Sequence, residues 1–203
     1  GMEGKIRDLF QASDDDLVRY TKARYVINEP FCVYDVTISG HCPYTIKNNA
    51  MSGLNFSMFA DMDCSDTLKA YYASQQELEK GMEFLLTSLE RGGRADNTVI
   101  VISSDHYPYG LEKSAAWGNE KDYVSELYGY EVTGNMERDH NALIIWSGCL
   151  EKEDPIVVKE PVYSLDILPT LLNLFGEDYD PGLLTGRDVF SEEEPLVIWR
   201  DYS

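Results

Sequence analysis

The spacing of apolar positions predicts several helices along the chain. Residues 14–27 have a helical pattern with acidic residues in the first turn, where negative charge suits the helix dipole. Residues 66–90 form the clearest helix, with Tyr71, Leu78, Met82, Leu85 and Leu89 on one stripe, and this pattern stops at two glycines. A short helix is expected within residues 119–128.

A further helix is predicted from residue 164 to residue 172. Its sequence contains Pro169, which a helix tolerates only in its first turn, so we expect Ser164 or Asp166 to cap the start. Gly176 is expected to end this helix.

Runs of β-branched, aromatic and aliphatic residues predict strands between the helices. The runs at 99–102 and 142–146 are apolar without alternation, which is typical of strands buried on both faces of a parallel sheet. Residues 31–38 and 195–199 are expected as further strands, the latter at an edge, and residues 42–64 as a long loop. The alternation predicts an α/β fold, a layered mixed sheet flanked by helices, in a single domain spanning residues 1–203.

The composition excludes some classes of partner. The chain has 36 acidic and 17 basic residues, a formal net charge of -19. Nucleic acid is therefore a poor partner, because it is bound through clustered cations. No apolar run approaches the ~20 residues that cross a bilayer, so we expect no membrane span in this chain. Cys32 and Cys149 lie in apolar runs and are expected as buried free thiols, with a disulfide as the alternative.

Two chemically capable residues follow the predicted strand at 99–102. In α/β sheets, ligands bind beyond the carboxyl ends of the strands, and Asp105 and His106 lie at such an end. A carboxylate beside a neutral imidazole suits Mn²⁺, Zn²⁺ or Fe²⁺, whereas Asp alone suits Mg²⁺. The alternative is an Asp that caps a turn and a His that packs on Tyr107 and Tyr109.

The other two histidines lie next to predicted strands as well. His41 follows residues 31–38 beside a glycine and a proline, so it could contact substrate or donate a proton. The alternative is a turn histidine that bonds local backbone. His140 precedes residues 142–146 and so lies at the amino end of that predicted strand. We therefore expect it to have a structural role and to point away from the ligand crevice at the carboxyl ends of the strands.

Several stretches together resemble one family. Residues 36–44 (VTISGHCPY) are similar to the substrate-histidine stretch of the lipoteichoic acid synthase and phosphoglycerol transferase group, within the sulfatase and alkaline phosphatase superfamily. Residues 96–106 (DNTVIVISSDH) resemble its strand and metal motif, and residues 163–176 (YSLDILPTLLNLFG) resemble one of its helices. The match continues through 186–190 (GRDVF), so the resemblance covers nearly the whole chain.

The resemblance implies the C-terminal part of an alkaline-phosphatase-like fold. It implies metal-dependent transfer of phosphoglycerol from a lipid to a cell-envelope polymer or glycan, or hydrolysis of another phosphate or sulfate ester. By position, Asp105 and His106 look like metal ligands, for Mn²⁺ foremost and otherwise Mg²⁺ or Zn²⁺, and His41 looks like a ligand of the phosphoglycerol head group. The implied location is the extracellular face of a bacterial cytoplasmic membrane, with the anchor N-terminal to this chain.

The resemblance also predicts what this chain lacks. The family's nucleophile and first acidic metal ligand lie N-terminal to the matched stretches, and no residue here matches them, so we name no catalytic residue. Cys42 lacks the C-x-P-x-R pattern of a sulfatase nucleophile. We therefore expect a fragment that is inactive without the missing N-terminal half of the domain. The alternatives are a sulfatase or phosphatase of the same superfamily, and a non-catalytic module that retains the fold.

Overall fold

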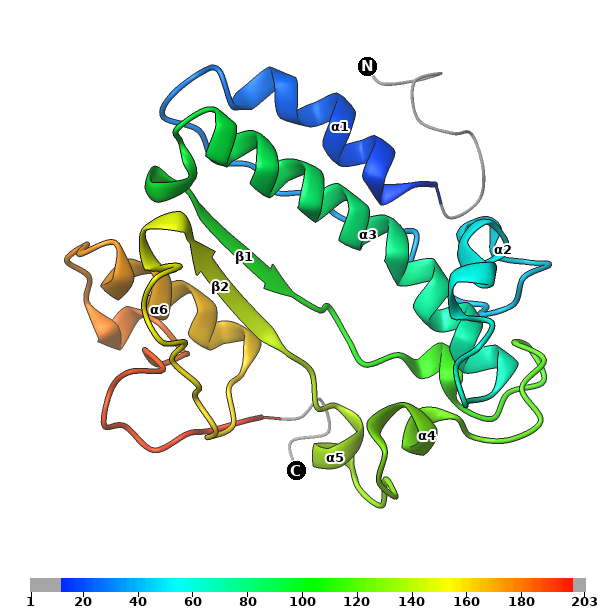
Figure 1. Cartoon of the computed structure of the whole chain (residues 1–203). Coiled ribbons are helices and arrows are strands. Elements are labelled where there is room, and N and C mark those ends of the chain that lie inside the picture. Colours follow the sequence, from blue (N-terminus) through cyan, green and yellow to red (C-terminus); the bar gives the residue numbers. More distant parts are fainter. Residues whose placement is uncertain (1–11, 199–203) are drawn as a thin grey trace. The chain divides into compact units, whose positions relative to one another are not determined.

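The computed structural model describes residues 12–198, and its chain divides into two compact units (Figure 1). The first unit ends at Lys152 and the second begins at Glu153. That all 203 residues form one domain stays a prediction. The first unit contains α1 (Asp14–Tyr25), α2 (Ala50–Asn55), α3 (Asp66–Arg91), β1 (Val99–Ser103), α4 (Val124–Tyr128), α5 (Asn135–Arg138) and β2 (Leu143–Ser147), and the second contains α6 (Ile167–Leu174).

Helices α1 and α3 confirm two of the predicted helices and pack along each other in the first unit (Figure 1). Ser13 caps α1 by accepting a hydrogen bond from the backbone N–H of Asp16 at 3.1 Å. The helices approach closely at Gly81, where an added Cβ would lie 3.1 Å from Cγ2 of Val18. No helix within residues 12–198 is both long enough and apolar enough to cross a bilayer.

The sheet is small, and its pairing differs from the prediction. Strands β1 and β2 pair antiparallel, with Val99 opposite Ser147 and Ser103 opposite Leu143. Burial on both faces is also wrong, because Ile144 is 52% exposed. One side of the sheet is covered where Ile100 and Trp146 pack against the end of α3. The fold class is confirmed as a mixed helix and sheet structure, with a small antiparallel sheet flanked by helices.

Three other segments correct the sequence analysis. Residues 31–38 form no strand and are mostly exposed, with Tyr34 at 90%. Residues 195–198 form no strand either, and residue 199 lies outside the described part of the chain. The expected loop at 42–64 contains α2 and a 3₁₀ turn at Phe56–Phe59. Helix α2 was missed because it is too short to show a period, although Asn49 supplies its N-cap.

The burial expected for two cysteines is also wrong. Cys32 and Cys149 are exposed, whereas Cys42 is buried, and all four cysteines are free thiols. The apolar runs around Cys32 and Cys149 therefore did not predict burial, since burial depends on which neighbours cover a segment.

The second unit is organised around the start of α6. Pro169 lies in the first turn of this helix, as predicted, and Gly176 follows its end with φ of +68°. The expected side-chain cap is absent at Asp166. Its buried carboxylate instead accepts hydrogen bonds from the backbone N–H groups of Tyr163 and Arg187, each at 2.9 Å. Asp166 thereby ties the segment after α6 to the entry of the helix.

Candidate active site

The turn after β1 places the two predicted metal ligands side by side. Oδ2 of Asp105 lies 3.4 Å from Nε2 of His106, and the side chains are 85% and 47% exposed respectively. The imidazole also packs on the ring of Tyr109, with 4.7 Å between ring centroids. The packing of His106 on Tyr109 agrees with the alternative interpretation, whereas the metal-ligand role of the pair stays a prediction.

A backbone carbonyl sets the tautomer of His106. Its Nδ1 lies 2.7 Å from the carbonyl oxygen of Tyr107. A carbonyl oxygen only accepts, so Nδ1 carries the proton and the neutral ring has its lone pair on Nε2. A metal binds this form of the ring, and a carbonyl bonded to the other nitrogen is the usual support for a ligating histidine.

His41 has the same local arrangement. The ring is on an exposed residue, and Nδ1 donates to the carbonyl oxygen of Cys42 at 2.7 Å. The structure therefore contains the backbone hydrogen bond that the alternative interpretation of His41 predicted. This bond again leaves the lone pair on Nε2, the nitrogen nearer the end of the side chain.

The loop that carries His41 packs against the turn that carries His106. An added Cβ on Gly110 would lie 2.9 Å from Cε2 of Tyr44, within van der Waals overlap. Burial raises the pKa of Tyr109, and the neighbouring Cys42 contributes to this rise. Burial raises the pKa of Tyr44, and the neighbouring charges that contribute include Asp105. Cys42 and Tyr44 therefore pack against Gly110, although the two segments are far apart in sequence.

The donor set fits a divalent metal only as part of a ligand shell. Among residues 12–198, no three side chains of His, Cys, Asp or Glu converge on a common point. Asp105 and His106 are adjacent oxygen and nitrogen donors, a combination that suits Mn²⁺ or Zn²⁺. These two donors fit a divalent metal ion, but they would leave most of its coordination positions to other ligands.

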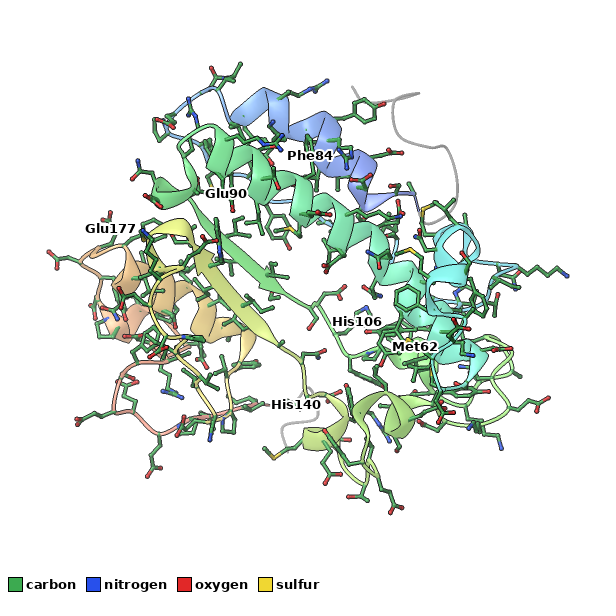
Figure 2. The ribbon with its side chains drawn as sticks, in the orientation of Figure 1. Met62, Phe84, Glu90, His106, His140 and Glu177 are labelled. Atoms are coloured by element: carbon green, nitrogen blue, oxygen red, sulfur yellow. The ribbon has the colours of Figure 1, made fainter. Side chains whose placement is uncertain are left out.

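The antiparallel pairing changes the place of His140. Because Ser103 lies opposite Leu143, the carboxyl end of β1 and the amino end of β2 are the same end of the sheet. Figure 2 shows His106 and His140 at this shared end. The expectation that His140 points away from the crevice assumed parallel strands, and this assumption is wrong.

Polar contacts connect the turns that precede β2 and follow β1. The Tyr128 hydroxyl donates to the carbonyl oxygens of Arg138 and His140, at 2.9 and 3.1 Å. Oε1 of Glu112 accepts from the Tyr107 hydroxyl at 3.0 Å and lies 3.5 Å from Nε of Arg138. Burial, followed by the bond to Glu112, raises the pKa of Tyr107 to about 12, so its hydroxyl remains a donor at neutral pH.

Comparisons with known proteins identify a matching family model, related proteins and a similar fold. The family model described as Sulfatase matches residues 5–177. The lipoteichoic acid synthases of Staphylococcus aureus strains USA300 and NCTC 8325 are each 27% identical over 172 residues, which is 85% of this chain. The chain spans 25% of the length of these relatives. A solved structure titled "Crystal structure of Ps i-CgsB" matches 85% of this chain and 35% of its own, with a TM-score of 0.56 and 20% identity, and this likeness shows the fold.

Proposed function

The chain belongs to the sulfatase family, as a lipoteichoic acid synthase-like domain, and we propose that it carries part of the active site of a metal-dependent phosphoglycerol transferase. The substrates would be a phosphoglycerol lipid and a cell-envelope lipid or glycan. The observation that carries the proposal is the packing of residues 41–44 on the turn that presents Asp105 and His106. We propose that the His41 imidazole and the Asp105–His106 pair serve one ligand, and this packing of their segments supports the proposal.

Each of the three residues has a separate role in this proposal. Asp105 and His106 would hold the metal, with Mn²⁺ foremost and Mg²⁺ or Zn²⁺ as the other candidates. When bound, the metal would activate a hydroxyl nucleophile and balance the charge on the phosphoryl oxygens. His41 would bind the head group through Nε2, which accepts a hydrogen bond from a glycerol hydroxyl when the ring is neutral.

The rest of the catalytic machinery is proposed to come from polypeptide outside these 203 residues. That part would supply the nucleophile, an acidic metal ligand and the membrane anchor, with the site on the extracellular face of a bacterial cytoplasmic membrane. We propose that the chain is inactive alone. The proposed ligands support this, because within residues 12–198 no third His, Cys, Asp or Glu side chain joins Asp105 and His106, and a shell with so few protein ligands binds a metal weakly.

Metal binding is the first test. We expect titration with Mn²⁺, followed by electron paramagnetic resonance, to detect weak binding that Asp105→Asn reduces about tenfold, as expected for loss of one charged ligand. Asp96→Asn is the matched control, because Asp96 lies before the start of β1, at the other end of that strand. Equal binding by the chain and by Asp105→Asn would contradict the metal assignment.

Turnover is the second test, and it separates the candidate activities. The 203-residue chain and the complete gene product would be incubated with a fluorescent phosphatidylglycerol, an aryl sulfate and an aryl phosphate. We expect transfer from the lipid by the complete product alone, and its loss in Asp105→Asn. Preferential hydrolysis of the aryl sulfate or aryl phosphate would favour the sulfatase or phosphatase alternative. Turnover by the chain alone would contradict its proposed inactivity.

A further inference from the structure

Asn49 holds the backbone of the His41 turn from one side. Its side chain is fully buried, and Nδ2 donates to the carbonyl oxygens of His41 and Ser39, at 2.8 and 3.3 Å. Its Oδ1 accepts from the backbone N–H of Ser52 at 2.8 Å and so caps α2. Both amide hydrogens and the amide oxygen are thus in use, so the side chain has one orientation in this site.

Asp14 holds the same turn from the other side. Its carboxylate is 1% exposed and accepts from the backbone N–H of Ile38 at 2.8 Å, as well as from the N–H and hydroxyl of Ser39. The N–H of His41 donates to the carbonyl oxygen of Ile38 at 3.1 Å and closes the turn. The backbone of residues 38–41 is therefore fixed by two buried side chains from α1 and from the N-cap of α2.

We propose that Asn49 is a positioning residue for His41, with Asp14 anchoring the opposite side of the turn. This inference rests on the proposed role of His41 in binding the head group. The exposed imidazole has its Nδ1 bonded to the neighbouring carbonyl of Cys42, so the backbone of the turn decides where Nε2 points. A ligand that bridges His41 and the Asp105–His106 pair needs that direction to be constant, because small displacements of a binding group are costly.

The N-cap role of Asn49 permits variants that separate positioning from helix stability. Serine and aspartate both cap helices well, so Asn49→Ser and Asn49→Asp keep an acceptor for the N–H of Ser52. Neither residue offers two donors to the carbonyl oxygens of Ser39 and His41, and aspartate adds repulsion against both. Asn48→Asp is the matched control, because Asn48 is an exposed neighbour.

The test uses two readouts on the folded 203-residue chain. Nitrogen NMR of the histidine rings would report the tautomer of His41, and titration with glycerol 1-phosphate in the presence of Mn²⁺ would report ligand binding. For Asn49→Ser and Asn49→Asp we expect a mixed His41 tautomer and about tenfold weaker glycerol phosphate binding, a change that corresponds to the loss of about one hydrogen bond. The affinity for Mn²⁺ should stay within about twofold of the parent. Asn48→Asp should match the parent in all three.

The outcomes distinguish this inference from the proposed function. A His41 signal that is unchanged in both Asn49 variants would overturn the positioning role, whatever happens to ligand binding. If His41→Ala binds glycerol phosphate as well as the parent does, the head-group role fails. In that case a changed His41 tautomer in the Asn49 variants would still support control of the imidazole by Asn49.

Discussion

A Cβ atom on Gly110 would lie 2.3 Å from the Cβ atom of Cys42, so these two residues can be neighbours only because position 110 has no side chain. Gly110 lies in the turn that follows His106, and Cys42 directly follows His41. This close approach therefore brings the segment that carries the candidate head-group ligand against the turn that follows the candidate metal ligands.

We expect Gly110→Ala to push these segments apart. The overlap is with the side chains of Cys42 and Tyr44, which are both buried, so the added methyl group should lower the free energy of unfolding by about 1–3 kcal/mol. Chemical denaturation would measure the loss, and NMR would show shifted ring signals for His41 and His106. Gly134→Ala is the control, because an added Cβ at Gly134 meets no atom within 4 Å. Equal stability of the two variants would contradict the close contact.

The helices were predictable because their determinants are local. The acidic start of α1, the basic end of α3 and the position of Pro169 in α6 all lie within a turn of the element they define. Strand pairing is different, since an apolar run indicates burial but names neither its partner nor its direction. The run in β1 was assigned to a parallel sheet for this reason, and the error carried over to His140.

The candidate site was predictable only in part, for a similar reason. Asp105 and His106 are neighbours in sequence, so their proximity needed no tertiary information. The contact of the His41 loop with their turn depends on Gly110, whose sequence context does not distinguish it from a turn glycine. Asn49 was missed because a polar residue in a loop is expected to be exposed. Its buried amide instead bonds the carbonyl oxygens of Ser39 and His41, and no hydrophobic periodicity in the sequence indicates these contacts.

The cysteines should differ in reactivity according to their burial. We expect Cys32 and Cys149, which are exposed, to be labelled by a maleimide well before Cys42 in the native protein. Burial raises the pKa of the Cys42 thiol, which lowers its thiolate fraction further. Mass spectrometry of peptides after timed labelling would give the order. Rapid labelling of Cys42 in Gly110→Ala alone would show that the segments separate as predicted above, whereas rapid labelling in the parent would contradict its burial.

A buried carboxylate on α3 should make stability depend on acidity. Burial would raise the pKa of Glu77, but hydrogen bonds from Ser13, Asn55 and Lys80 outweigh it and lower the pKa below its ordinary value. A depressed pKa in the folded state means that the stabilisation is complete above about pH 4.3, the ordinary value, and is lost as the pH falls further.

Glu77→Gln should remove this stabilisation. We expect the variant to be about 1–3 kcal/mol less stable than the parent near neutral pH, because a glutamine carries no charge and keeps only one of the two acceptor oxygens at this buried position. The difference should stay constant above about pH 4.3 and shrink as the pH falls from there towards about 2, as the parent carboxylate becomes protonated. Urea denaturation across this range would measure it, with Glu79→Gln as the control on the exposed side of the same helix. A difference that stays constant with pH would show that packing, and not charge, is responsible.

Gly186 should be essential for the second unit. An added Cβ there would lie 2.1 Å from the carbonyl oxygen of Leu165 and 2.3 Å from its carbonyl carbon, and a backbone group cannot rotate away as a side chain can. The clash is next to Asp166, whose carboxylate accepts the N–H of Arg187 at 2.9 Å. We therefore expect Gly186→Ala to break this bond and to loosen the start of α6. The glycine of the GRDVF stretch would then be required by close backbone packing, independently of any catalytic role.

Hydrogen exchange would localise the effect of Gly186→Ala. We expect faster exchange of the amide of Arg187 and of amides in α6, while amides of α3 in the first unit keep their protection. Gly182→Ala is the matched control, because its added Cβ would meet only the flexible carboxylate of Asp180, at 3.2 Å. Unchanged protection at Arg187 in Gly186→Ala would mean that the segment after α6 can move away without loss of the bond to Asp166. Close packing would then not explain why position 186 is a glycine.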